Sequence, residues 1–149
     1  MRYLLLILLF PVISGLTSKE GSAQNLHSSS GKAMKAYNEG VSLYDYFDFK
    51  NAEKNFKIAI STDKNFYEAY LMLGELMSKQ LLYKEAVIYY RQAVKIDSLF
   101  YPPVFFSLAE AEFNTGNYGS ALVHYQVYLK QKNISDKNRA VATRKLNNC

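Results

Sequence analysis

The sequence has 149 residues, the length of a single domain, and 49% of them are hydrophobic, which provides a buried core and excludes wholesale disorder. The net charge of +5 is mild and the lysines are scattered, which indicates a solvated basic surface rather than a nucleic-acid-binding site. The 13 Tyr and 9 Phe residues, with no Trp, indicate helix interfaces packed with aromatic rings.

Residues 1–23 have the layout of a secretory signal peptide. A short positive end precedes an apolar run over 3–13, and residues 14–23 are small and polar. The apolar run is too short to span a membrane. We therefore expect cleavage before Gln24, a periplasmic or otherwise extracytoplasmic location that includes association with the outer membrane, and no stable membrane insertion of the mature chain. The alternative is an uncleaved N-terminal anchor.

Residues 24–31 are rich in Ser and Gly, and we expect them to form a linker whose serines cap the first helix. The single cysteine, Cys149, excludes an internal disulfide. We expect it to be an inert terminal thiol, with intermolecular pairing as the alternative.

The rest of the chain predicts an all-α protein of seven helices. Turn residues separate the helices, among them Asp63, Asp97 and the run 115–117, in which Gly116 is the expected left-handed residue. The predicted helices cover about residues 32–46, 49–61, 66–79, 83–96, 103–115, 118–131 and 136–147. Ser135 is the expected N-cap of the last helix, and segment 135–149 has the polar surface of a cap that closes a repeat array.

A grid of small and aromatic residues recurs through these helices. In its central copy, Tyr70, Leu73 and Gly74 are followed by Ala86 and Tyr90. Spacings of 34 and 35 residues relate three sets of positions: Gly40, Gly74 and Ala109; Ala52, Ala86 and Ala121; and Phe56, Tyr90 and Tyr125. This grid resembles the tetratricopeptide repeat (TPR) family.

The TPR resemblance implies repeats over about 33–66, 67–100 and 102–132, within 32–132. The implied fold is a right-handed α-solenoid of three helix pairs, followed by a C-terminal capping helix. In that fold the first helix of each pair lines a concave groove.

The repeat positions that face this groove predict an aromatic and aliphatic trough with Glu75 and Glu110 in it. The predicted groove residues are Tyr37, Val41, Tyr44, Leu71, Glu75, Phe106, Glu110 and Phe113. The same count of positions also includes Met34, Glu68, Ser78 and Pro103. Such a trough suits an extended peptide or an amphipathic helix carrying Lys or Arg. The alternative is a groove filled by the linker or by a following domain.

The best-known peptide-binding device of the TPR family is a clamp of Lys, Asn and Arg that holds a C-terminal carboxylate. At the corresponding positions this sequence has Tyr37, Val41, Leu71 and Glu75. A function in binding chaperone tails is therefore not expected.

The sequence contains no catalytic constellation, so we expect a protein that is not an enzyme and that has no cofactor and no metal site. His27 lies in the linker, and His124 is expected to be a surface or inter-helix residue. Glu110 and Glu112 are two residues apart on a helix and should not share a face.

Several segments also resemble the N-terminal TPR module of large Gram-negative envelope proteins. They are residues 65–74, 100–103, 128–129 and 148–149. In those proteins the module precedes propeller-type repeats and a peptidoglycan-binding OmpA-like domain, and some are tied to type IX secretion. This sequence has neither following domain, so peptidoglycan binding is not carried over to it. Within 97–99, Ser98 matches the short O-glycosylation signal of that bacterial group.

Together these features predict a non-catalytic periplasmic adaptor that binds a protein or peptide partner, for example an envelope protein, and that does not bind nucleic acid. The alternative is a structural or scaffolding module of an envelope assembly. A monomer in solution favours the adaptor, and an oligomer favours the scaffold.

Overall fold

The computed structural model describes residues 26–149, so the predicted signal peptide lies outside the described residues. This part of the chain contains seven α-helices and no strand, which confirms the all-α prediction. The helices are α1 (Gly31–Asp45), α2 (Phe49–Thr62), α3 (Tyr67–Lys79), α4 (Tyr83–Ile96), α5 (Val104–Asn114), α6 (Tyr118–Leu129) and α7 (Asp136–Leu146). No helix in 26–149 has the length and apolarity needed to cross a bilayer.

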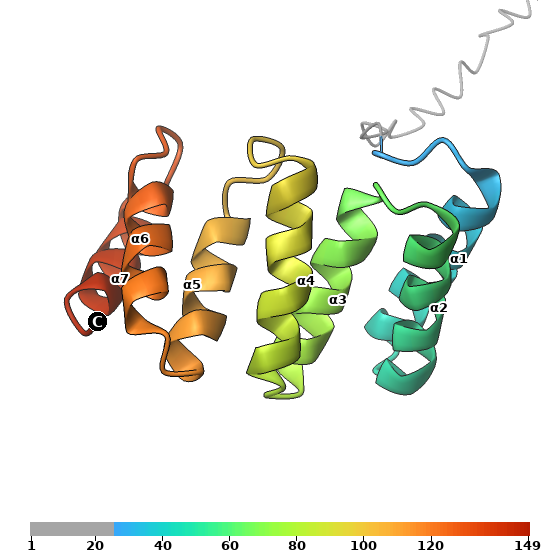
Figure 1. Cartoon of the computed structure of the whole chain (residues 1–149), viewed down its shortest axis with the longest axis horizontal. Helices are drawn as coiled ribbons and strands as arrows, with labels where there is room; N and C mark the ends of the chain where they lie inside the picture. The colour runs from blue at the N-terminus through green and yellow to red at the C-terminus, as the bar shows by residue number, and fades with distance from the viewer. Residues whose placement is uncertain (1–25) are drawn as a thin grey trace, which may run out of the picture.

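The helices form a row of antiparallel pairs, as Figure 1 shows. The strongest packing is within the pairs α1–α2, α3–α4 and α5–α6. Successive pairs meet through α2 with α3 and through α4 with α5, and α7 closes the row by packing on α6. The first helices also touch each other, α1 with α3 and α3 with α5, so they line a common face. The architecture is a helical solenoid.

The small residues of the grid permit the close approach of paired helices. A Cβ added at Gly40 would lie 2.7 Å from the Phe56 ring, and one added at Gly74 would lie 2.5 Å from the Tyr90 ring. Real Cβ atoms essentially never come this close to other atoms, so each ring packs directly on a bare stretch of helix backbone. Phe56 and Tyr90 are almost fully buried as a result.

The helix ends agree with the predicted caps. Ser30 and Ser135 each accept a hydrogen bond from a backbone N–H of the helix that follows, at 3.3 Å. The ends of the helices differ from the expected ones by at most two residues, and Pro103 precedes α5 as its N-cap. Pro102 and Pro103 form the turn before it, and their carbonyls accept the N–H groups of the second and third helical residues.

The turn within each pair contains one residue in the left-handed conformation. Gly116 has φ +80°, as predicted. The equivalent residues of the first two pairs are Phe47 and Leu81, both at φ 62°, where a side chain is strained. Both side chains are mostly exposed, and the Phe47 ring packs edge-on against the Phe49 ring, at 6.0 Å between centroids.

Candidate binding groove

All eight predicted groove residues lie on α1, α3 and α5. Each is half-buried, which places none of them wholly in the core and none wholly in solvent. We call the half-buried surface of these three helices the first-helix face.

The α1 end of this face is built from rings that also pack the repeats together. The Tyr37 ring lies 4.9 Å from the Phe66 ring, and the Tyr44 ring lies 5.7 Å from the Phe49 ring. Burial, together with the negative charges of Glu68 and Glu75, raises the pKa of the Tyr37 hydroxyl to about 12. The Tyr37 hydroxyl therefore stays neutral, and the rings give the face an apolar surface with hydroxyl groups.

Glu75, on α3, holds the unpaired charge of this face. Burial raises the pKa of its carboxyl, and the nearby Lys79 ammonium only partly opposes that effect. Among residues 26–149, no side chain makes a hydrogen bond or ion pair with this carboxylate. Its charge also contributes to the raised pKa values of Tyr90, which burial brings to about 12, and of Tyr101. A half-buried carboxylate without a partner is a suitable receptor for a cation.

The second predicted acid, Glu110 on α5, is already engaged. Its carboxylate accepts a short hydrogen bond from the Tyr125 hydroxyl and forms an ion pair with Lys145 at 3.0 Å. Lys145 comes from α7, which lies outside the repeat grid, so counting repeat positions could not reveal this contact. The neighbouring ring of Phe106 packs on Tyr125 and Tyr128, at 5.7 and 5.3 Å between centroids.

A pocket of about 290 Å³ lies at the α7 end of the face. Its lining combines four apolar or aromatic side chains with two polar ones: Pro103, Phe106, Tyr128, Val141, Ser107 and Asn138. Sequence reasoning identified Phe106 and Pro103 but missed the contribution of α7. The pocket has the size and polarity to hold one apolar side chain of a ligand.

The predicted linker is fixed to the repeats by His27. The His27 backbone N–H donates to both carboxylate oxygens of Glu68, at 3.2 and 3.3 Å, and its Nδ1 lies 3.0 Å from one of them. Its Nε2 lies 3.4 Å from Asp97, and its ring packs edge-on against Phe100 at 4.6 Å. We call residues 26–30 the N-terminal strap. The strap engages Glu68, one of the counted groove positions, and leaves Glu75 unpaired.

The strap makes stability depend on pH. Burial alone would lower the pKa of His27, but the hydrogen bonds and charges of Glu68 and Asp97 outweigh burial and raise it. Protonated His27 therefore stabilises the fold fully below its unfolded pKa of about 6.5, and this contribution is lost as pH rises through the higher folded value. We expect His27→Gln to cost about 1 kcal/mol at pH 6 and less at pH 9, measured by urea unfolding. A cost that does not change with pH would contradict this.

A buried ion cluster joins the second and third pairs. Glu112 on α5 is fully buried and accepts hydrogen bonds from Arg91 on α4, at 2.7 and 3.2 Å. Its other oxygen lies 2.6 Å from His124 Nδ1 on α6. Burial raises the pKa of the Glu112 carboxyl, but His124 and Arg91 together bring it below its usual value, so it is ionised. His124 is thus an inter-helix residue, as expected.

The two acids of α5, Glu110 and Glu112, contact different partners, which confirms that they do not share a face. Residues 26–149 contain no group of three or more His, Cys, Asp or Glu side chains that could hold a metal ion. Ser98 is exposed in the loop between α4 and α5, and Cys149 is exposed and free.

The sequence matches no protein-family model and no curated protein sequence. The structure is similar to the TPR2B domain of yeast Sti1 in its complex with pHsp70, with a TM-score of 0.71 and 21% identity over 80% of this chain and 98% of that one. It is also similar to the first TPR of Spaghetti (RPAP3) bound to an HSP90 peptide, with a TM-score of 0.70 and 15% identity over 82% of this chain and 93% of that one. A third similar structure is the type III secretion translocator chaperone SycD of Yersinia enterocolitica, with a TM-score of 0.70 and 18% identity over 81% of this chain and 85% of that one. These likenesses show that the fold is that of tetratricopeptide repeats.

Proposed function

We propose that the protein is a non-catalytic adaptor that binds a peptide or helix of a protein partner on its first-helix face. The observation that carries the proposal is Glu75, a half-buried carboxylate on a face rich in aromatic rings, which has no hydrogen-bond or ion-pair partner within residues 26–149. The Sti1 and RPAP3 structures, which share the fold, contain a protein or peptide ligand. The signal-peptide layout of residues 1–23 supports a periplasmic location. The resemblance to envelope modules supports an envelope protein as the partner.

The chemistry of the face favours a ligand segment with one Lys or Arg and an apolar residue. A ligand cation at Glu75 would offset the unfavourable burial of this carboxylate. An apolar side chain in the pocket beside Phe106 would add contact area without requiring hydrogen bonds. Because Lys145 already neutralises Glu110 and the Tyr125 hydroxyl donates a hydrogen bond to it, we expect a single basic position rather than two.

The test is a selection of random peptides displayed on phage, with the wild-type chain and a Glu75→Gln variant as baits. We expect the wild type to enrich peptides containing Lys or Arg and the variant to lose that enrichment. Glu75→Gln keeps the side-chain shape and removes a charge that burial disfavours, so its melting temperature should not fall. Variants of Tyr37 or Phe106 are poorer tests, because their rings also pack the repeats.

Enrichment of the same basic peptides by both baits would show that their binding does not depend on the Glu75 carboxylate. If neither bait enriches any peptide, the adaptor function is wrong and the scaffold becomes the better function. Light scattering over a range of concentrations then completes the test, because a scaffold that self-assembles should show a mass that rises with concentration.

A further inference from the structure

The N-terminal strap covers a polar site at the start of α3. Figure 1 shows the strap, at the blue beginning of the described chain, close to the first turn of that helix. Glu68 on α3 and Asp97 at the end of α4 both contact the His27 ring, at 3.0 and 3.4 Å. Because a carboxylate only accepts hydrogen bonds, both ring nitrogens donate here only when His27 carries its positive charge. The strap therefore places a cation of this chain between two carboxylates.

The fit of the strap in this site is incomplete. The Tyr67 side chain is fully buried, and its hydroxyl has no hydrogen-bond partner among residues 26–149. Its ring lies 5.2 Å from the His27 ring, and the charges of Asp97 and Glu68 add to burial in raising the pKa of the hydroxyl. A buried hydroxyl without a partner is destabilising, so a ligand that supplied one more donor would fit the site better than His27 does.

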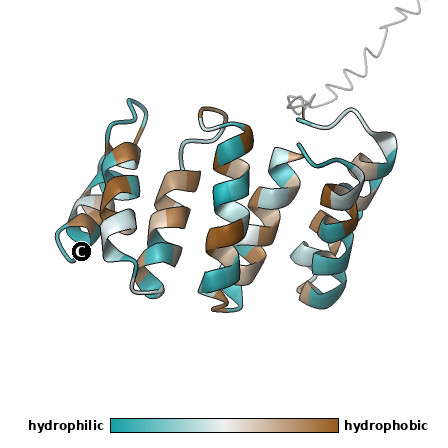
Figure 2. Cartoon of the chain, viewed as in Figure 1, coloured by the Kyte–Doolittle hydropathy of each residue, from teal (hydrophilic) through white to brown (hydrophobic). Residues whose placement is uncertain are grey.

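Polar contacts hold most of the strap in place. Leu26 packs on buried residues of α1, α2 and α3, but the residues after it, 27–30, are one histidine and three serines. Figure 2 shows this segment and the loop between α2 and α3 in largely hydrophilic colours. A segment held mainly by polar contacts can exchange with another segment that makes the same contacts.

The covered site lies in line with Glu75. Glu68 and Glu75 are seven residues apart on α3, so they lie on the same side of the helix, about 10.5 Å apart along its axis. An extended peptide advances about 3.3 Å per residue, so two basic side chains three residues apart in a ligand would match these two carboxylates. With His27 in place the ligand meets Glu75 alone, and without it the ligand meets both.

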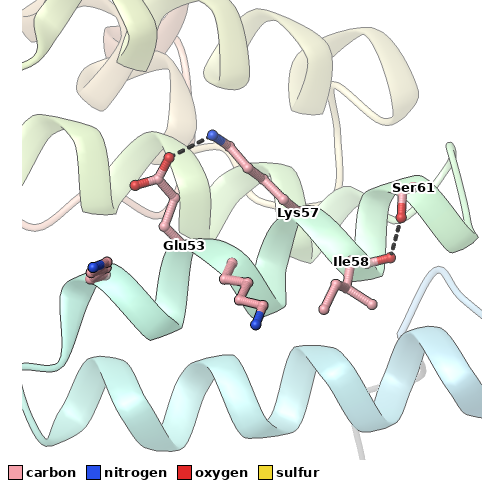
Figure 3. A pocket seen from close by; sticks show the side chains of 6 residues that line it. Glu53, Lys57, Ile58 and Ser61 are labelled. Atoms are coloured by element: carbon pink, nitrogen blue, oxygen red, sulfur yellow. Dashed lines mark hydrogen bonds and ion pairs between the residues drawn. The ribbon is translucent and has the colours of Figure 1, made fainter.

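Charge directs a basic segment to this side of the array. Helices α3 and α5 together carry four acidic residues and one basic residue, whereas α2 and α4 each carry three basic residues and one acidic residue. Figure 3 shows α2, where the single acid, Glu53, already pairs with Lys57, at 2.6 Å. Lys64 and Lys95 line the pocket beside His27, but within residues 26–149 neither forms an ion pair with the carboxylates of the covered site. Both carboxylates therefore have His27 as their ion-pair partner in this part of the chain.

We propose that the strap is a displaceable internal ligand, and that the site it covers receives a second basic residue of the partner segment. This inference rests on the proposed function and adds a regulated second position to it. Arginine suits the site, because its guanidinium has five N–H donors against the three N–H groups of His27, enough to reach Glu68, Asp97 and Tyr67 together. Because the strap must leave first, its presence lowers the affinity for such a segment.

Two variants with opposite expected effects test the proposal. His27→Ala removes the internal ligand, so it should lower stability and yet strengthen the binding of a peptide with two arginines. Tyr67→Phe removes a hydroxyl that has no partner within residues 26–149, so the melting temperature should not fall, and yet the same binding should weaken. The matched control is Ser29→Ala, which changes an exposed residue of the strap and leaves His27 in place.

The measurement is an NMR titration of the expected mature chain, residues 24–149, which contains every described helix. The probes are acetyl-Arg-Ala-Ala-Arg-amide and the two peptides in which one of its arginines is replaced by glutamine. At saturation of the wild type with the two-arginine peptide, we expect the backbone N–H signal of His27 to move to the position typical of an unstructured segment.

We expect His27→Ala to bind the two-arginine peptide about fivefold more tightly than the wild type, and Tyr67→Phe about fivefold more weakly, which is the effect of one hydrogen-bonded contact. The Ser29→Ala control should bind it as the wild type does. Equal affinity of the wild type and His27→Ala, or a His27 signal that does not move at saturation, would overturn the proposal and leave binding at Glu75 intact. If no variant binds any of the peptides, the proposed function fails together with this inference.

Discussion

Gly74→Ala is expected to destabilise the protein by about 2 kcal/mol, although alanine is a better helix former than glycine. The new Cβ would lie 2.5 Å from Tyr90 Cδ1, and the ring cannot withdraw because it is only 2% exposed. Overpacking of this kind must push α3 and α4 apart. Urea unfolding followed by circular dichroism measures the change, and a stability equal to or above that of the wild type would contradict the expected clash.

Gly119→Ala is the matched control for this prediction. Gly119 lies in the first turn of α6, and an added Cβ there would meet no atom within 4 Å. The same substitution should therefore stabilise the protein by about 0.5–1 kcal/mol. Adding Tyr90→Leu to Gly74→Ala should recover part of the loss, since it removes the ring that the new methyl group meets.

Arg91→Met is expected to cost about 2–3 kcal/mol at pH 7. The substitution leaves the fully buried Glu112 carboxylate with His124 as its remaining partner, and a buried charge that loses a partner is strongly destabilising. The lowered pKa of Glu112 means that the ionised cluster contributes stability above the unfolded pKa of about 4.3. That contribution is lost as pH falls through the folded value. The difference between wild type and variant should therefore be full at pH 7 and shrink toward pH 3, measured by urea unfolding.

The double variant Arg91→Met/Glu112→Met separates two explanations for the loss. Replacing a buried ion pair with packed apolar side chains is often nearly neutral, so the double variant should be more stable than Arg91→Met alone. His124 is partly exposed and can be hydrated when Glu112 is gone. A double variant less stable than Arg91→Met would show that Arg91→Met loses stability because of the packing around Arg91, and not because the Glu112 carboxylate has lost its Arg91 partner.

The repeat grid could be predicted from the sequence because its signals are local. The small residue at Gly74 and the ring at Tyr90 belong to one helix pair, and the caps at Ser30 and Ser135 act within one turn of helix. The contacts of the first-helix face depend on segments far apart in the chain. Nothing in the residue spacing relates Glu110 to Lys145, or His27 to Glu68 and Asp97.

The left-handed turn residues Phe47 and Leu81 were missed for a different reason. A sequence shows that Phe47 and Leu81 stand where a third repeat has Gly116, but only the backbone shows that all three residues are left-handed. Hydrophobic residues at that position otherwise suggest one more core contact. Their exposure and their strain are both properties of the folded chain.

The N-terminal strap changes how the array can come apart. In a solenoid each repeat contacts only its neighbours, so its ends fray independently and opening spreads one unit at a time. His27 precedes the first helix pair and reaches Asp97, 70 residues further on, where the second pair ends. The first pair is thus held at both of its borders, by α3 on one side and by its own leading segment on the other. Local opening of α1 and α2 is thereby coupled to the second pair, and the N-terminal half of the array behaves as one cooperative unit.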